Sequence, residues 1–156
     1  GLASQVIAQT DNVRWLGTLR YAAATILALR EPPERTPDFS VPESDVLLPS
    51  QPARLLGLAN GSFTGGGMKM VPSANLCDGQ GDLVLLSQSS SLKLLWLLLN
   101  VFFGTHVHDK NVTITKCNHL IAKLKKHHDL VVDGEVYRLK GTVDIRIRNQ
   151  AVNLIV

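Results

Sequence analysis

The sequence is poor in cysteine and aromatic residues and contains no hydrophobic run long enough to cross a membrane. Cys77 and Cys117 are its only two cysteines in 156 residues. Because they lie far apart, they provide neither a zinc-ligand spacing nor a disulfide framework, and a reducing, cytoplasmic compartment is expected. The most hydrophobic segment, residues 92–103, falls well short of the ~20 residues that span a bilayer. We therefore expect no transmembrane helix and no disulfide bond.

Positive charge interleaved with aromatic residues is also missing. Aromatic residues make up 5% of the sequence and charged residues 19%, and the formal net charge is +3. Nucleic-acid-binding proteins usually carry clustered basic residues with aromatic neighbours, so we expect no nucleic-acid partner. A short basic run over residues 123–128 is typical of a solvated face, and attraction to anionic lipid is the alternative.

The remaining composition predicts one globular domain, since 45% of the residues are hydrophobic and the length suffices for a single core. Apolar residues at helical spacing predict a helix over residues 12–30, followed by a proline-rich, acidic segment over residues 31–52 that is expected to be a loop or an edge excursion. A second helix is expected over residues 92–103, after three serines that can cap it. This helix is either buried or touches a membrane with one face.

Short apolar and alternating segments between turn residues predict strands for most of the remaining chain. Period-two alternation is clearest over residues 143–148. The expected strands cover residues 54–59, 82–87, 112–115, 130–132, 136–139, 143–148 and 152–156. The predicted fold class is therefore mainly β with two or three helices, arranged as an antiparallel β-sandwich.

A glycine-rich segment lies between the first two of these strands. Gly65–Gly67 are followed by Met68 and Lys69, which does not make a Walker A loop, since that motif needs Gly-x-x-x-x-Gly-Lys-[Ser/Thr] before a helix. A wide turn or a bulge is the alternative to a phosphate-handling role. Further on, Asp78 and neighbouring backbone carbonyls could form an oxygen shell for Mg²⁺ or Ca²⁺. The dipeptide Asp78-Gly79 is equally typical of a hairpin turn.

A second acidic group, Asp133-Gly134-Glu135, lies between two strand-like segments. Its two carboxylates could provide a general base and an acid that orients it. A hairpin turn explains the same three residues. His106 and His108 have the spacing of one face of a strand, where hydrogen-bonded or solvated histidines are the usual interpretation and metal binding the alternative.

Taken together, these motifs occur in a recognisable order along the chain: Asn60-Gly61-x-Phe63-x-Gly65-Gly66-Gly67-Met68-Lys69, Pro72, Asp78-Gly79-x-x-Asp82, a leucine-rich helix ending in Gly104-Thr105-His106-Val107, and Asp133-Gly134-Glu135. In this order and spacing the chain resembles the carboxy-terminal region of the diacylglycerol kinase catalytic-domain family. That family includes soluble bacterial diacylglycerol and related lipid kinases and the sphingosine and ceramide kinases. The resemblance extends over essentially the whole chain.

The resemblance implies a two-domain kinase. Residues 1–156 would form its carboxy-terminal β-sandwich domain, which completes the cleft. An amino-terminal α/β domain would carry a Gly-Gly-Asp-Gly nucleotide loop, a sequence that does not occur in this chain. We therefore expect the amino-terminal nucleotide-binding domain to be absent from this chain, and the chain alone to be incomplete and inactive.

The resemblance also implies roles for individual residues. Asp133 is similar to the general base that takes the proton from the lipid hydroxyl, and Glu135 to its acidic companion. Asp78 is similar to the side-chain ligand of a divalent metal, with the carbonyls of Asn75 and Gln80 beside it.

The implied function is an ATP-dependent lipid kinase of phospholipid biosynthesis. With Mg²⁺ as its cofactor, it would transfer the γ-phosphate to a hydroxyl of a diacylglycerol-like lipid. The alternatives are a sphingoid-base or ceramide kinase, or a non-catalytic β-domain that binds lipid or a partner. The expected partners are ATP and the lipid substrate, with peripheral membrane contact, and a homodimer is an open option.

Overall fold

The structure is a computed structural model in which residues 2–10, 12, 15, 20–28, 37–42, 53–87 and 89–151 are described. These residues contain two antiparallel sheets of three strands each, with the orders β1-β5-β6 and β2-β3-β4. The strands are β1 (Asp38–Ser40), β2 (Ala53–Ala59), β3 (Gly81–Ser87), β4 (Val112–Cys117), β5 (His119–Val132) and β6 (Glu135–Arg146). The predicted fold class, a mainly β antiparallel sandwich, is confirmed.

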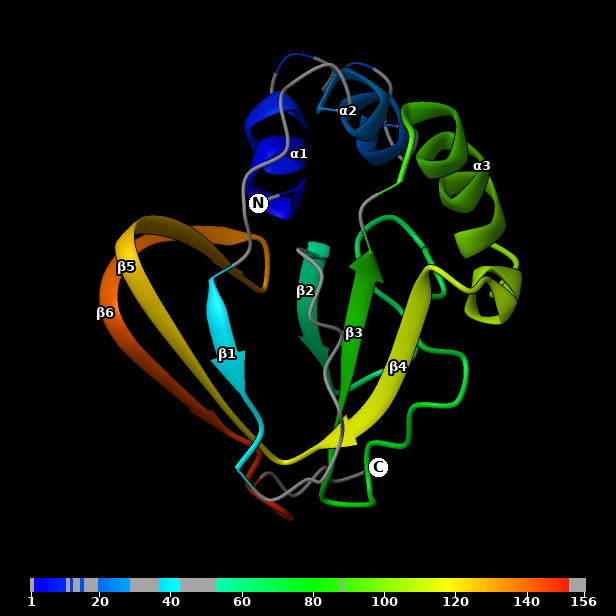
Figure 1. The fold of residues 1–156 in the computed structure, drawn as a ribbon. Coiled ribbons are helices and arrows are strands. Elements are labelled where there is room, and N and C mark those ends of the chain that lie inside the picture. The colour runs from blue at the N-terminus through cyan, green and yellow to red at the C-terminus, as the bar shows by residue number, and fades with distance from the viewer. Residues whose placement is uncertain are drawn as a thin grey trace.

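Helices gather at one end of the two sheets. The helices are α1 (Leu2–Thr10), α2 (Arg20–Ala28), α3 (Ser91–Val101) and the short 3₁₀ helix η2 (Thr105–His108). Figure 1 shows α1 and α2 at the upper end, where the two sheets are furthest apart, and α3 beside them at the outside of the molecule. The sheets meet at the lower end, where β4 continues into β5. Within the described residues, no helix is long and apolar enough to cross a membrane.

The core lies between the two sheets. Leu83 and Leu85 of the central strand β3 are 0% and 1% exposed, and as alternate residues of a strand they share one face. They belong to a cluster that draws on both sheets, with Leu120 from β5 and Cys117 from β4. Partly buried side chains from β1, β2 and β6 pack against this cluster, namely Phe39, Leu56, Leu58 and Ile145.

Strands β5 and β6 form a hairpin that is longer than the sequence predicts. Only residues 130–132 of β5 were expected as a strand, and β6 was expected as two pieces, 136–139 and 143–148. The pairing register shifts between Leu124↔Gly141 and His128↔Leu139, so residues 125–127 of β5 lie opposite residue 140 alone. This bulge interrupts the sequence alternation while the strand itself continues.

The amino-terminal half departs further from the prediction. Within the helix expected over residues 12–30, residues 20–28 form α2, while residues 13, 14, 16–19, 29 and 30 lie outside the described residues; α1 was not predicted. Strand β1 lies inside the segment expected to be a loop or an edge excursion. It is an edge strand of its sheet and pairs with β5 through partners such as Phe39↔Ala122. His106 and His108 lie in η2, so they do not share the face of a strand that their spacing suggests. The strand expected over residues 152–156 lies outside the described residues.

Candidate functional site

The acidic loop that precedes β3 is held together by its own side chains. The backbone N–H of Gln80 donates to Asp78 Oδ1 at 2.9 Å, and the N–H of Cys77 donates to Asn75 Oδ1 at 3.0 Å. Between them, Gly79 has φ +72°, and a Cβ added there would lie 2.8 Å from Asn149 Cγ. These contacts fix the direction in which the Asp78 carboxylate points.

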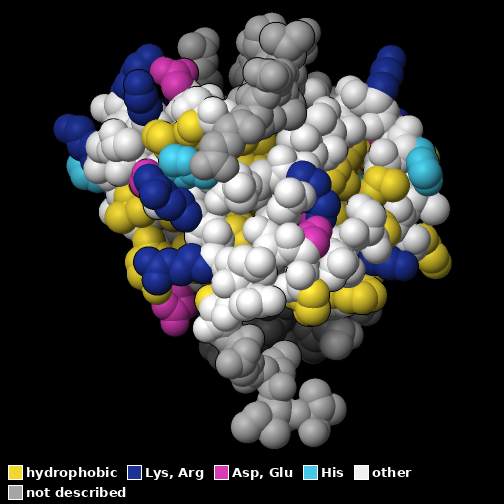
Figure 2. Space-filling model, turned by 90° about the horizontal axis from the view of Figure 1, so that it is seen from below, with side chains coloured by type: hydrophobic (Ala, Val, Ile, Leu, Met, Phe, Trp, Pro, Cys, Tyr) yellow, Lys and Arg dark blue, Asp and Glu magenta, His cyan; other side chains and the backbone are white. Residues whose placement is uncertain are grey.

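Lys116 joins this loop to the sheet. Its ammonium nitrogen lies 2.8 Å from Asp78 Oδ2 and 3.1 Å from Asp82 Oδ2. Asp82 pairs directly with Lys116 across strands β3 and β4, and its side chain is only 3% exposed. Figure 2, seen from below, shows acidic side chains scattered among Lys and Arg over this face and not gathered into one patch.

The titration of these groups reflects the shared contact. The hydrogen bond from Lys116, followed by that from the Gln80 N–H, lowers the pKa of Asp78. In the reverse direction, the hydrogen bond to Asp78 raises the pKa of Lys116. Both groups are therefore charged at neutral pH, and the ammonium compensates two carboxylates.

The fit of this loop to a divalent metal follows from the same contacts. Asp78 supplies one carboxylate, but its Oδ1 already accepts an N–H and its Oδ2 already contacts the Lys116 ammonium. Beyond it, Asn75 and Gln80 would contribute only neutral carbonyl oxygens. Among the described residues, no three His, Cys, Asp or Glu side chains gather closely enough to hold a metal ion. In this arrangement Lys116 takes the place of the cation, so the loop does not fit Mg²⁺ unless that lysine turns away.

The second predicted site residue, Asp133, lies at the tip of the β5–β6 hairpin. Val132 and Glu135 are paired across the strands, so Asp133 and Gly134 form a two-residue turn. Their φ values are +49° and +92°, as a type I′ turn requires at both central positions. The hairpin interpretation of these residues is confirmed, and it places an exposed carboxylate on a tightly defined turn.

A phenol lies beside the two carboxylates of the tip. The hydroxyl of Tyr137 donates to Glu135 Oε2 at 2.8 Å. This hydrogen bond, then desolvation and the charge of Asp133, raise the pKa of the Tyr137 hydroxyl. The tip thus groups an exposed carboxylate with a second carboxylate that has its own hydrogen-bond donor.

The two predicted sites do not come together. Lys116 and Asp78 lie near the residue at which β5 begins, whereas Asp133 follows the residue at which the 14-residue β5 ends. Figure 1 shows the beginning of β5 at the lower end of the molecule and its turn into β6 at the other end of the hairpin. A shallow depression of about 540 Å³ runs along β4 and is lined in part by Asp82 and Lys116, but not by the hairpin tip.

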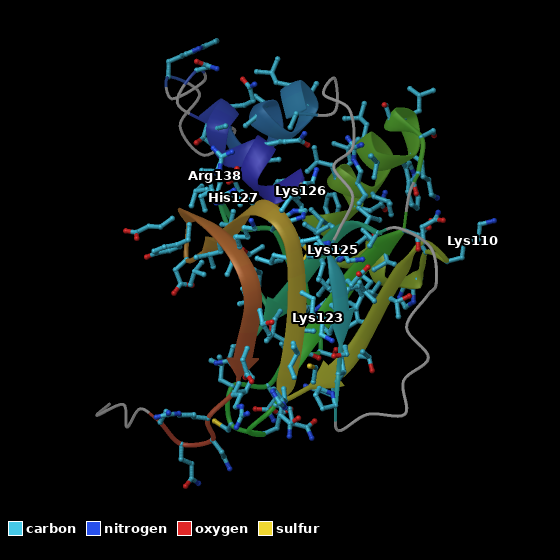
Figure 3. All side chains as sticks on the ribbon, turned by 60° about the vertical axis from the view of Figure 1, so that its left-hand side comes forward. Lys110, Lys123, Lys125, Lys126, His127 and Arg138 are labelled. Carbon is cyan, nitrogen blue, oxygen red and sulfur yellow. The ribbon has the colours of Figure 1, made fainter. Side chains whose placement is uncertain are left out.

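Basic side chains follow the outer part of the hairpin. Lys123, Lys125, Lys126 and His127 of β5 and Arg138 of β6 are exposed, as Figure 3 shows. Lys125 contacts Asp38 of β1 at 2.7 Å. The run thus lies on a solvated face, as the sequence predicts, and its lysines and histidine at residues 125–127 coincide with the bulge.

Sequence reasoning missed Lys116 and Tyr137. Tyr137 follows Glu135 by two residues, so period-two spacing could have placed both side chains on one face of a strand. Lys116 could not have been found in this way, because its contact with Asp82 depends on the register between two strands.

The fold defines the class of the domain, an antiparallel β-sandwich with helices at one end. The family model described as "YegS C-terminal NAD kinase beta sandwich-like domain" matches residues 1–156, and the chain belongs to this family.

Curated relatives agree with this membership, and a solved structure shares the fold. The chain is 33% identical over 90 residues to "Putative lipid kinase YtlR" of Bacillus subtilis (strain 168), covering 58% of this chain and 28% of that protein. It is 28% identical over 71 residues to "Diacylglycerol kinase" of the same organism, covering 46% and 23%. A crystal structure titled "a putative diacylglycerol kinase from Bacillus anthracis str. Sterne" has the same fold, with a TM-score of 0.57 at 17% identity over 85% of this chain and 46% of that one. The chain therefore spans less than half the length of these relatives.

Proposed function

We propose that the protein containing this chain transfers the γ-phosphate of ATP to a hydroxyl of a diacylglycerol-like lipid. The observation that carries the proposal is the exposed Asp133 carboxylate on a two-residue turn, with Glu135 beside it, in a chain whose curated relatives are named lipid kinases. A base must reach the hydroxyl of its substrate, and a rigid turn at a hairpin tip presents a carboxylate in this way.

The chemistry assigned to the tip is general-base catalysis. As the lipid hydroxyl oxygen bonds to the γ-phosphorus, its proton passes to the Asp133 carboxylate, and the bond between the γ-phosphorus and the leaving ADP oxygen breaks. Glu135 is the second carboxylate of the tip and lies on the strand that leaves the turn. Tyr137 holds Glu135 in place through its 2.8 Å hydrogen bond.

The proposed reaction also needs ATP and Mg²⁺, which the contacts described above do not bind. Phosphoryl transfer requires neutralisation of the phosphate charges, which Mg²⁺ supplies when it accompanies the nucleotide. We assign nucleotide binding to the part of the protein that this chain does not cover, so the chain alone is expected to be inactive. The metal-ligand set Asn75, Asp78 and Gln80 stays a prediction. The contact between Asp78 and Lys116 argues against it. We place the enzyme in the cytoplasm, at the membrane surface.

The experiment that tests the function is a lipid panel offered to the complete protein with γ-labelled ATP and Mg²⁺. Diacylglycerol, a sphingoid base and ceramide present different hydroxyl groups, so the labelled product identifies the substrate class. Label in phosphatidic acid supports the proposal. Label only in a sphingoid or ceramide phosphate would replace the substrate, and the absence of any labelled lipid would leave the chain as a binding domain.

A further inference from the structure

Helix α3 carries apolar side chains on two opposite faces. The buried face consists of Leu94, Leu97, Leu98 and Val101. The opposite face, here called the α3 stripe, consists of Leu92 (82% exposed), Trp96 (48%), Leu99 (60%) and, just beyond the helix, Phe103 (80%). The spacing of four, three and four residues aligns these side chains along the helix. An exposed apolar stripe of this length on a domain surface indicates an interaction site for a protein or a membrane.

The border of the α3 stripe is positively charged. Helix α3 contains no acidic residue, and it carries Lys93, whose ammonium nitrogen lies 4.2 Å from the centre of the Trp96 ring. Asp109, the nearby carboxylate, is paired with Lys93, and its side chain is only 8% exposed. Lys110 follows it and is exposed, as Figure 3 shows. The Lys93–Asp109 pair carries no net charge, so the excess positive charge beside the helix is that of Lys110.

We propose that the α3 stripe lies in the interfacial layer of an anionic bilayer. The proposal rests on the lipid kinase function proposed above, since that substrate must be reached in a membrane. A helix of 11 residues is too short to cross a bilayer, but it can lie in the interface with its apolar side chains among the acyl chains. Trp96 is a residue type enriched at this depth, and the lysines beside it suit anionic headgroups.

The charge distribution favours a membrane over a second copy of the chain. A two-fold contact through the α3 stripe would repeat the same surface on both partners, with the net positive charge of Lys110 beside each helix. Like charges brought together in this way oppose association. Anionic headgroups complement the same border.

The test measures vesicle binding of the complete protein without ATP, by sedimentation with phosphatidylcholine vesicles and with vesicles that also contain phosphatidylglycerol. The variant Trp96→Ser/Phe103→Ser removes two members of the stripe, and Trp15→Ser/Phe63→Ser removes two side chains that are 82% and 67% exposed elsewhere. We expect the stripe variant to bind anionic vesicles at least about tenfold more weakly, and the control variant to bind like the wild type. Leu99→Glu, which introduces a negative charge into the stripe, should also lose binding.

Several results would overturn the proposal. Wild-type vesicle binding by both stripe variants would exclude α3 as the contact. Conversion of a dimer to a monomer with unchanged vesicle binding would assign the stripe to a second copy. A lower melting temperature with unchanged vesicle binding would assign it to another part of the protein. Failure of the proposed function is recognised separately, as lack of phosphorylation of detergent-dispersed lipid by a protein that still binds vesicles.

Discussion

The ammonium group of Lys116 lies 2.8 Å from the Asp78 carboxylate and 3.1 Å from that of Asp82. One lysine of β4 therefore ties the loop before β3 to the first residues of that strand. A tethered cation at this position does what a bound metal ion would do, since it balances two carboxylates and holds the loop against the sheet.

Replacement of Lys116 by Met is expected to destabilise the domain. Asp82 is almost fully buried, and its carboxylate would lose the ammonium group that compensates it. Leaving a buried polar group without its partner costs about 1–3 kcal/mol. Chemical denaturation should show this loss for Lys116→Met, whereas Lys126→Met, which changes an exposed lysine at the bulge, should stay close to the wild type. Equal stabilities for both variants would show that the two contacts of Lys116 contribute nothing.

The same variant tests the predicted metal ligands. Removal of the ammonium frees Asp78 Oδ2, so Mg²⁺ should raise the melting temperature of Lys116→Met and leave that of the wild type almost unchanged. Adding Asp78→Ala to Lys116→Met should abolish the response. A Mg²⁺ response of the wild type that Asp78→Ala removes would contradict this account and restore the loop as a metal site.

Alanine substitutions at two glycines with positive φ distinguish the cost of backbone strain from the cost of steric crowding. At Gly104, φ is +73° and an added Cβ would lie 2.9 Å from Pro72 Cγ, whereas at Gly67, φ is +90° and no atom lies within 4 Å. Gly67→Ala should therefore cost about 1–2 kcal/mol for the left-handed backbone alone, and Gly104→Ala should cost more because the neighbour must move. Thermal unfolding measures both. Equal losses would mean that the loop around Pro72 adapts freely.

Burial of His106 predicts a loss of stability in mild acid. His106 is 4% exposed, its Nε2 lies 3.0 Å from the carbonyl oxygen of Met70, and burial lowers its pKa below the ordinary 6.5. The free energy of unfolding that the neutral His106 ring contributes is fully present above about pH 6.5. It is lost as the pH falls from there through the lower pKa of the folded state, because the unfolded chain binds the proton first. The melting temperature should fall between neutral pH and pH ~5. His106→Gln should be less stable at neutral pH and show a shallower fall, and an unchanged slope would exclude His106 as the cause.

Much of the fold was predictable because local patterns dominate it. The apolar segments around β2, β3 and α3 and the turn at Asp133-Gly134 were predicted from the sequence. The continuity of β5 was not, because residues 125–127 lie at a bulge where the alternation breaks. Strand β1 depends on a partner more than 80 residues away in sequence, and no local pattern encodes such pairing.

For the candidate site, the sequence predicted the types of functional group but not their positions relative to one another. Acidic residues on Gly turns indicated carboxylates at Asp78 and Asp133, and both lie in turns of the structure. Their separation to opposite ends of β5 and the contact of Asp78 with Lys116 depend on strand length and register, which the sequence does not display. Their roles as metal ligand and base stay predictions.

The central claim is most directly tested by comparing Asp133→Asn with the wild type in the complete protein, measuring transfer of labelled phosphate from ATP to diacylglycerol. Asn followed by Gly suits the same type I′ turn, so the variant loses the base while keeping the hairpin. Asp129→Asn, on the same hairpin, is the matched control. The account predicts a fall of about 100- to 10,000-fold for Asp133→Asn alone, with an unchanged melting temperature. Near-wild-type transfer by Asp133→Asn, or no transfer to lipid by the wild type, would contradict it.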